Sequence, residues 1–269
     1  MATRATVAPV YEVFALRYAH FADRTQGSNL LFPDDHAAPM PLDFFLWAIR
    51  GNGRTIVFDT GFDEASARRR NRTWLRSPIA ALRGIGIDPA EVADVVLSHM
   101  HWDHAGNWAD FPKARFHLQD SEMAYCTGRC MCHEPLRRPF DAEHVATAVR
   151  HVFAERVKFH AGSAEIAPGI TLHLVGGHSG GLQIMRVPTT RGWVVLASDA
   201  SHFWVNIRRR IPFVLLHNLE RMIEGWVTCE ELADGPDHII PGHDPEVLRR
   251  FPKHPGDADT VRLDLPPIA

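Results

Sequence analysis

The chain has 269 residues, of which 45% are hydrophobic, so it is long enough to bury a large core as a single domain. Its 29 basic and 32 acidic residues give a formal charge of −3, which excludes the basic field that holds a nucleic-acid backbone. No segment approaches the roughly 20 apolar residues of a membrane span, and no signal peptide precedes the first strand, so we expect a cytoplasmic protein. Four cysteines in a chain of this length predict reduced thiols rather than a disulfide framework.

The first half of the chain is expected to begin with β-structure. Apolar alternation predicts strands at 10–17, 43–50 and 54–59. The turn Gly51-Asn52-Gly53 predicts a hairpin between the last two. The polar segment 21–41 is too long for an ordinary connection, so we expect a functional flap or a subunit arm. Capping patterns then predict that helices begin at Ser77-Pro78 and at Asp88. The apolar run 92–97 predicts another strand.

The second half mixes strands and helices without strict alternation. Strands are expected at 114–118, 171–175, 182–187, 193–197 and 237–240. Helices are expected at 120–125, 141–151 and 214–233. The proline- and aspartate-rich tail from about residue 252 is expected to pack loosely. Because no repeat or linker divides the chain, we predict one α/β layered domain over residues 1–269.

Residues 97–106, LSHMHWDHAG, place four potential metal ligands directly after an apolar strand. His99, His101 and Asp103 alternate, so on an extended segment they point the same way, whereas His104 turns to another side. One loop therefore offers ligands to two adjacent ions. A single histidine is usually a surface or hydrogen-bonded core residue, but burying this whole cluster without a metal leaves polar groups hard to satisfy. The spacing predicts a metal site.

Two metal ions need more ligands than this segment holds. Three further candidates each follow a predicted strand. His178 lies among glycines in 176–181, Asp199 follows the strand at 193–197, and His243 follows the last strand. We expect all three to meet the first cluster.

These residues together resemble the metal-binding pattern of the metallo-β-lactamase superfamily. The segment Phe58-Asp59-Thr60-Gly61 is similar to that superfamily's early DTG turn, and Pro241-Gly242-His243-Asp244 is similar to its last ligand loop. The resemblance spans about residues 43–244. It implies a four-layer αββα sandwich with a dinuclear zinc site along one edge.

The resemblance also implies a role for each ligand. One metal ion would bind His99, His101 and His178, the other would bind Asp103, His104 and His243, and Asp199 would bridge the two. Asp59 would orient a ligand loop through hydrogen bonds. Imidazole and carboxylate ligands suit Zn²⁺, although Fe, Mn and Co fit the same donor set.

Within the superfamily the chain resembles the N-acyl-homoserine lactonases most, through the phrase SHMHWDHAGN at 98–107 and Asp-Ala-Ser at 199–201. Histidine at position 101, where diiron relatives usually carry glutamate, favours hydrolysis over redox chemistry. Two positions depart from the lactonase pattern. His202 stands where those enzymes usually place a tyrosine, and Leu182 replaces a second histidine of the glycine loop.

We therefore expect a metal-bound hydroxide to open a small cyclic ester. Asp103 or Asp199 would shuttle a proton to the leaving group, and His202 would donate a hydrogen bond to the oxyanion or act as an acid. Aromatic residues beside the ligands are expected to line the substrate pocket: Trp102, Phe203 and Trp204.

Two other readings remain open from the sequence. A hydrolase of the same fold could act on a cyclic amide, an imide or a thioester, and a binding protein could use the metal only structurally. The arginine-rich runs at 68–72 and 208–210 are expected to be solvated, with attraction of an anionic substrate as the alternative. We expect a small-molecule substrate and, because related lactonases often pair, a homodimer.

Overall fold

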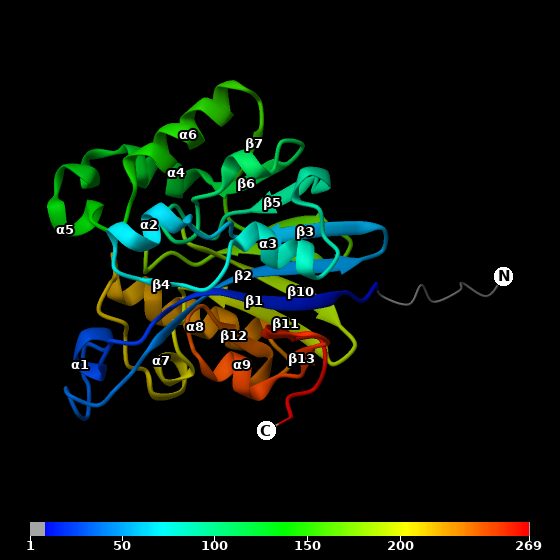
Figure 1. Ribbon diagram of the computed structural model, residues 1–269. Coiled ribbons are helices and arrows are strands. Elements are labelled where there is room, and N and C mark those ends of the chain that lie inside the picture. Colours follow the sequence, from blue (N-terminus) through cyan, green and yellow to red (C-terminus); the bar gives the residue numbers. More distant parts are fainter. Residues whose placement is uncertain (1–8, 269) are drawn as a thin grey trace.

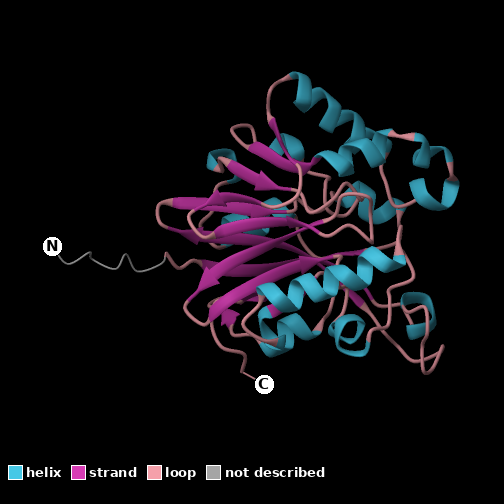
Figure 2. Ribbon diagram, turned by 180° about the vertical axis from the view of Figure 1, so that it is seen from behind, coloured by secondary structure: helices cyan, strands magenta, loops and turns pink. Residues whose placement is uncertain are grey.

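The computed structural model describes residues 9–268, in which two β-sheets pack face to face between layers of helices (Figures 1 and 2). The larger sheet contains β1 (Glu12–Phe21), β2 (Leu42–Gly51), β3 (Arg54–Phe58), β4 (Thr73–Trp74), β5 (Asp94–Val96), β6 (Arg115–Gln119), β7 (Val157–His160), β13 (Lys253–His254) and β14 (Asp257–Arg262). The smaller sheet contains β8 (Ala164–Ala167), β9 (Ile170–Leu174), β10 (Gln183–Thr189), β11 (Gly192–Ser198) and β12 (Ile239–Pro241).

The helices lie between the strands along the chain, and most of them are short. They are α1 (Gln26–Asn29), α2 (Glu64–Arg69), α3 (Pro78–Gly84), α4 (Asp120–Thr127), α5 (Glu134–Arg137), α6 (Ala142–Phe153), α7 (Trp204–Arg209), α8 (Leu219–Leu232) and α9 (Glu246–Arg250). Turns of 3₁₀-helix lie at Pro89–Glu91, Trp108–Asp110, Arg129–Cys132 and Pro236–His238. None of the described helices is long and apolar enough to cross a membrane.

In each sheet, strands that precede predicted ligand loops lie side by side. The larger sheet runs β13-β14-β1-β2-β3-β5-β6-β7 with β4 beside β1, and the smaller runs β12-β11-β10-β9-β8. The pairs β3–β5, β5–β6 and β11–β12 are parallel. Parallel strands end on the same side of a sheet, so the loops that follow β3, β5, β11 and β12 can supply neighbouring side chains.

Successive residues of β1 face opposite layers. Val13 and Ala15 lie in the apolar core between the two sheets, whereas Phe14 and Leu16 lie in the core beneath the helices that cover the larger sheet. Trp226 of α8 is part of a third core on the outer face of the smaller sheet. The layers are therefore helix, sheet, sheet and helix, and the predicted αββα sandwich is confirmed.

The predicted elements are found with shifted boundaries and some omissions. The expected long helix from 214 begins at Leu219 instead, because the Asn218 side chain accepts a hydrogen bond from the Arg221 amide and caps it. The helix expected at Asp88 is a single 3₁₀ turn. The strands β7 and β8 were not predicted, because each has four residues and little alternation.

The segment 21–41 folds against the loop before α8. Leu30 forms a β-bridge with Phe213, and the Val214 amide donates to the Asn29 carbonyl at 3.0 Å. Asn29 itself is buried and donates to the Met40 carbonyl at 2.7 Å. The segment is thus an ordered wall of the same chain.

The expectation of a loosely packed tail is wrong. Residues 253–262 form a hairpin whose second strand, β14, pairs antiparallel with β1. Val261 and Leu263 are fully buried, and the Arg17 guanidinium donates to Asp259 at 2.9 Å. Alternation of polar and apolar residues over 260–263 is the strand signal, which the surrounding prolines and aspartates obscure.

Truncation of a buried tail residue should therefore destabilise the whole domain. Leu263→Ala is expected to lower the free energy of unfolding by about 2–5 kcal/mol, because it leaves a cavity in the core between the sheets. Urea denaturation measures the effect. Ile268→Ala is the matched control, since that side chain is 67% exposed, and it should change stability by less than about 0.5 kcal/mol. Equal stability of the two variants would contradict this packing.

Candidate metal centre

The predicted ligands meet at the shared edge of the two sheets. The loop after β5 supplies residues 99–104, the loop after β9 supplies His178, the end of β11 supplies Asp199, and the end of β12 supplies His243. The six histidines in or beside this cluster and Asp199 are almost fully buried. Strand ends far apart in the sequence thus bring together all seven residues that the sequence analysis proposed.

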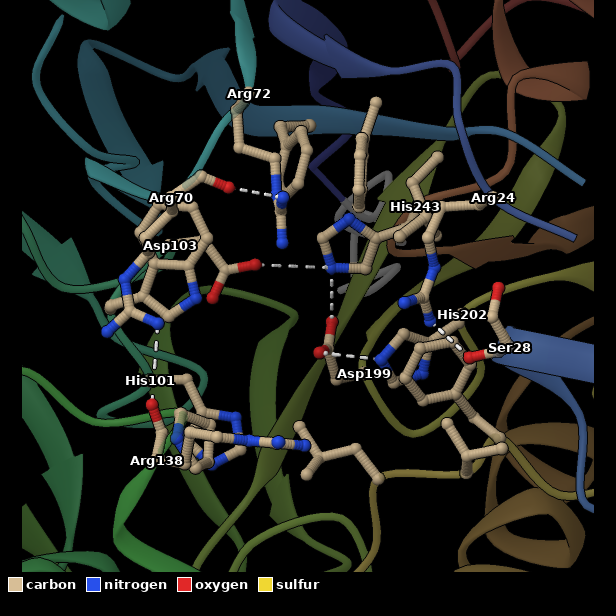
Figure 3. A pocket seen from close by; sticks show the side chains of 18 residues that line it. Arg24, Ser28, Arg70, Arg72, His101, Asp103, Arg138, Asp199, His202 and His243 are labelled. Atoms are coloured by element: carbon tan, nitrogen blue, oxygen red, sulfur yellow. Dashed lines mark hydrogen bonds and ion pairs between the residues drawn. The ribbon is translucent and has the colours of Figure 1, made fainter. Parts of the chain in front are cut away.

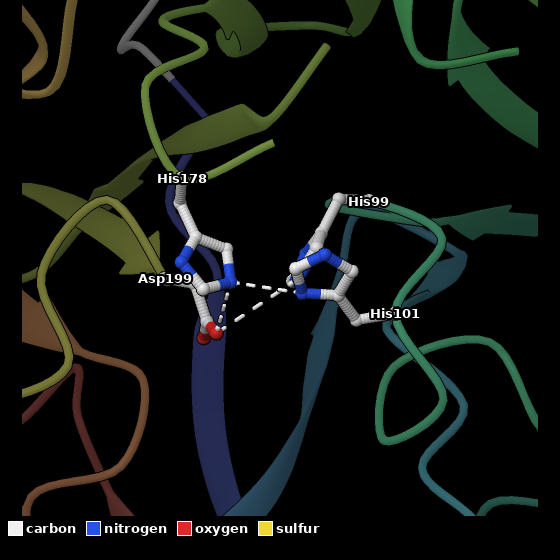
Figure 4. Close-up of side chains that lie close together, drawn as sticks. All are labelled: His99, His101, His178 and Asp199. Atoms are coloured by element: carbon white, nitrogen blue, oxygen red, sulfur yellow. Dashed lines mark hydrogen bonds and ion pairs between the residues drawn. The ribbon is translucent and has the colours of Figure 1, made fainter. Parts of the chain in front are cut away.

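One group contains His99, His101, His178 and Asp199, whose ligand atoms all lie within 4.8 Å of one another (Figure 4). His178 Nε2 lies 3.0 Å from Asp199 Oδ2 and 2.9 Å from His101 Nδ1. His99 Nε2 lies 3.8 Å from the same carboxylate oxygen. Three imidazole nitrogens and one carboxylate oxygen are therefore close enough to share one cation, and four such donors suit a tetrahedral zinc site.

The second group contains Asp103, His104 and His243 and uses the other oxygen of Asp199. His243 Nε2 lies 3.0 Å and His104 Nε2 3.4 Å from Asp199 Oδ1. Asp103 Oδ2 lies 3.7 Å from His104 Nε2 and 3.9 Å from His243 Nε2. Each oxygen of Asp199 therefore faces its own group of ligands, which suits a carboxylate that bridges two cations.

Some polar atoms of this cluster are not satisfied by their neighbours. His99 Nε2, His104 Nε2 and Asp199 Oδ1 are buried and lack a hydrogen-bond partner of suitable geometry. Buried polar atoms without partners are costly, and a bound cation would satisfy all three. The residues present therefore fit a dinuclear metal site.

The charge states of the cluster suit metal binding. Burial and the neighbouring histidines lower the pKa of His99 and His101 well below the usual value, so both imidazoles are neutral. Burial raises the pKa of Asp199, but the surrounding histidines hold it well below its usual range, so the carboxylate is ionised. Burial also lowers the pKa of His104 and His243, yet the carboxylates around them raise it overall. Metal binding to that second group therefore releases protons.

Asp59 holds the loop that carries the first ligands. Its backbone has a φ of 64°, and its carboxylate accepts hydrogen bonds from the Ser98 amide at 2.7 Å and the Ser98 hydroxyl at 2.8 Å. The same carboxylate lies 2.7 Å from His104 Nδ1. A proton on Nδ1 leaves the lone pair of His104 Nε2 directed at the second group of ligands.

Backbone carbonyls orient two of the other imidazoles. His178 Nδ1 lies 2.8 Å from the Leu215 carbonyl, and His243 Nδ1 lies 2.9 Å from the Asp43 carbonyl. Each contact fixes the proton on Nδ1 and leaves Nε2 free as a ligand atom. The fold thus selects Nε2 of each ring as the atom that would bind a metal ion.

Glu122 of α4 joins the two ligand loops of the first group, and the sequence analysis missed it. Its buried carboxylate accepts from the Met100 amide at 2.8 Å, the Ser179 hydroxyl at 2.7 Å and the Gly181 amide at 2.8 Å. A Cβ at position 181 would lie only 2.1 Å from the Glu122 nitrogen, so the close approach requires glycine. In the sequence, Glu122 is one more acidic residue in a first helical turn, which carries no signal of this role.

Comparison with known proteins identifies the family. Residues 45–250 match the metallo-beta-lactamase superfamily. The chain belongs to this superfamily. It is 25% identical over 206 residues to an N-acyl homoserine lactonase of Bacillus cereus, an alignment that spans 71% of this chain and 76% of that enzyme.

Solved structures of this superfamily share the fold. A quorum-quenching N-acyl homoserine lactone lactonase superposes with a TM-score of 0.72 at 22% identity, covering 89% of this chain and 94% of that one. The dizinc quorum-quenching lactonase AidC gives 0.67 at 16% identity, covering 89% and 90%. The expected metallo-β-lactamase fold and the expectation of a metal-dependent hydrolase are thereby confirmed.

A cavity of about 640 Å³ opens beside the ligands (Figure 3). Its walls come from the segment 21–44, the turn after α2, the ligand loops and the loop before α8. The lining residues are Phe21, Arg24, Ser28, Leu42, Phe44, Arg70, Arg72, His101, Trp102, Asp103, Arg138, Pro139, Asp199, His202, Phe213, Val214, Leu215 and His243.

The aromatic residues expected in this cavity are only partly there. Trp102 lines it, but Phe203 and Trp204 do not. Phe203 packs behind Phe213, and the Trp204 indole donates to the Ile239 carbonyl at 2.8 Å inside the core. The prediction for Trp204 fails because this residue begins α7 and its side chain turns inward.

His202 borders both the cavity and the ligand cluster. Its Nε2 lies 3.0 Å from Asp199 Oδ2, and its ring stacks on Phe213 with centroids 3.5 Å apart. Burial lowers the pKa of His202 to about 3, so the imidazole is neutral. Asp199, His202 and His243 also form a third close group, so His202 has to be tested as a ligand as well.

Removing the charge of Asp59 should weaken metal binding without altering the fold. Asp59→Asn keeps a residue that tolerates a positive φ but loses an acceptor for Ser98 and His104. We expect metal affinity to fall about 10-fold to 100-fold, measured by competition with a chelator. Asp63→Asn is the control, because asparagine can still cap α2 there. Unchanged affinity in Asp59→Asn would contradict the assigned role.

Proposed function

We propose that this chain is a dinuclear metal hydrolase that opens a lactone ring. The observation that carries the proposal is the division of Asp199 between two ligand groups at the wall of a substrate-sized cavity. The similarity to N-acyl homoserine lactonases supports a cyclic ester as the substrate, and the imidazole and carboxylate donors support zinc.

Bound metal ions would acidify a water molecule and polarise the substrate carbonyl. One ion would be held by His99, His101 and His178, the other by Asp103, His104 and His243, and Asp199 would contact both. The side chains around the ligands exclude water and orient the substrate. Buried walls of the ligand cluster exclude bulk water, and the cavity orients the ring toward Asp199.

Asp103 and His202 are the side chains best placed to handle protons and developing charge. Asp103 is the most exposed of the proposed ligands, with 13% of its side chain accessible, so it is suited to pass a proton to the leaving alkoxide. A neutral His202 places Nε2 at the ligand cluster, where an N–H stabilises negative charge on the carbonyl oxygen. Asp199 fixes the two ligand groups relative to each other, because each of its oxygens contacts one group.

The first test measures metal content and turnover on one preparation. Elemental analysis should find about two metal ions per chain, and a pH-indicator assay should detect ring opening of lactones. His101→Ala should lose turnover by several orders of magnitude because it removes a ligand of the first group. His133→Ala replaces an exposed histidine and should leave turnover unchanged.

Other outcomes of that assay would separate the remaining readings. Turnover of cyclic imides or thioesters alone would support the hydrolytic metal site and refute a lactone as the substrate. Two metals with no turnover of any substrate, together with a melting temperature that falls on chelation, would indicate a metal-stabilised binding protein. Full turnover by His101→Ala would refute the assignment of the ligands.

A matched pair of variants tests His202. His202→Phe retains an aromatic ring on Phe213 but has no donor, so kcat should fall about 100-fold to 1,000-fold with two metals still bound. His202→Tyr differs from it by one hydroxyl donor and should recover part of the loss. Steady-state kinetics and elemental analysis are measured together. Loss of a metal ion in both variants would instead make His202 a ligand, and equal full activity would give it no role.

A further inference from the structure

Arginine dominates the charged lining of the cavity. Arg24, Arg70, Arg72 and Arg138 line it, and its acidic lining residues are Asp103 and Asp199, both of which face the metal ligands (Figure 3). With two divalent cations bound, the cavity carries a large excess of positive charge. A neutral substrate would make no use of that excess.

Three of these guanidinium groups alternate with aromatic rings along one wall. Arg24 lies 5.8 Å and Arg72 3.8 Å from the ring centre of Phe21. On the next ring, Arg72 lies 5.8 Å and Arg70 4.5 Å from the centre of Trp102. Stacking on aromatic faces fixes the planes of the guanidinium groups. We call these five residues the arginine wall. Arg24 donates from Nε to Asn29 Oδ1 at 2.7 Å and from a terminal nitrogen to the Ser28 carbonyl, whereas most N–H groups of Arg70 and Arg72 face no strong acceptor.

None of the four cavity arginines forms an ion pair within the described residues 9–268, although arginines elsewhere on the surface pair with aspartate or glutamate. Arg70 donates only to the carbonyls of Arg138 and Phe140, both at 3.4 Å. Arg72 donates to the Arg70 and Asn71 carbonyls, and its buried Nε has no partner. Several donors of the wall are therefore unused.

Half-buried guanidinium groups without a counter-charge are costly to the fold. Burial lowers the pKa of Arg24, Arg70 and Arg72, which records the penalty of keeping these charges away from water. Asp103 attracts Arg70 and Arg72 but also belongs to the second ligand group. An anion from solution would satisfy the wall without competing for a ligand.

We propose that the substrate carries an oxyanion, a carboxylate or phosphate, on the substituent beside its lactone ring, and that the arginine wall binds this group. The lactone in this statement rests on the proposed function, whereas the oxyanion rests on the wall alone. The planar fork of a guanidinium group donates two parallel hydrogen bonds to either anion. The Phe44 ring lies 6.0 Å from Trp102 of the wall and 5.3 Å from the ligand His243, centre to centre. With Leu42 it forms an apolar part of the cavity that fits a short hydrocarbon spacer.

Matched substrates test the proposal in the metal-loaded protein. The lactones differ only in whether their amide chain ends in a methyl group, a carboxylate or a phosphate monoester. We expect kcat/KM to be at least about 10-fold higher for an anionic end, mainly through KM. Arg24→Gln and Arg72→Gln should each lower the ratio of kcat/KM between the anionic and the methyl-ended lactone by about 10-fold or more. The preferred anion distinguishes carboxylate from phosphate.

Arg115→Gln is the matched control, because Arg115 is exposed on β6 and lies outside the cavity lining. It should keep the full preference. Melting temperatures show whether each variant is folded. The preference of the unaltered protein for an anionic lactone is measured without any variant, so it tests the proposal even if a variant fails to fold. A higher kcat/KM for the methyl-ended lactone, with ring opening intact, would overturn the oxyanion proposal and leave the proposed function standing.

A binding measurement separates this inference from lactone chemistry. Titration calorimetry of the metal-loaded protein with adipate and with inorganic phosphate should show saturable binding of at least one, lost in Arg72→Gln and kept in Arg115→Gln. Such binding without hydrolysis of any lactone would support the oxyanion site and reject the proposed reaction. Absence of binding to either anion, together with equal kcat/KM for all three lactones, would refute the arginine wall as a recognition site.

Discussion

The carboxylate of Asp199 is the constraint on which the site depends. It is buried among imidazoles from both sheets, and no single neighbour satisfies both of its oxygens. The backbone around it is correspondingly tight, since Ser198 has a φ of 45° and a Cβ at position 242 would lie 2.8 Å from Asp199 Oδ1. Glycine at 242 lets the loop after β12 bring His243 alongside. Cations bound on both sides of this carboxylate would therefore tie the two sheets together and stabilise the sandwich.

Chemistry and recognition come from different parts of the chain. The proposed ligands sit at the ends of strands, where Asp59 and Glu122 fix their loops through hydrogen bonds to backbone amides. The four arginines of the cavity instead come from the segment 21–41, the turn after α2 and the segment before Pro139. Rigid strand ends preserve a ligand geometry, whereas loops can change their side chains without disturbing it. This division lets the strand ends keep the fold that the chain shares with lactonases while the loops supply the arginines of the cavity.

The parts of the site that sequence reasoning could predict are those encoded by local spacing. Alternation of His99 and His101 after an apolar strand correctly indicates ligands that share one group. Asp103 was expected on the same side, but residues 102–104 form a turn, so Asp103 joins His104 in the second group. The role of Glu122 could not be predicted, because its carboxylate accepts hydrogen bonds from backbone amides of two distant loops and no local sequence pattern indicates such contacts. Trp204 was misplaced because a residue that begins a helix can point to either side, and packing between the sheets decided the direction.

The arginine run at 68–72 shows why a charge pattern alone does not fix its role. Arg68 and Arg69 lie on α2 and are exposed, as expected of a solvated face. Arg70 ends that helix, and Asn71 follows with a φ of 53°, which reverses the direction of the chain. Arg70 and Arg72 are thereby turned onto Phe21 and Trp102 rather than into water. One left-handed residue thus divides a uniform basic stretch into a solvated half and a half that lines the cavity, so the recognition surface depends on the end of a helix rather than on net charge.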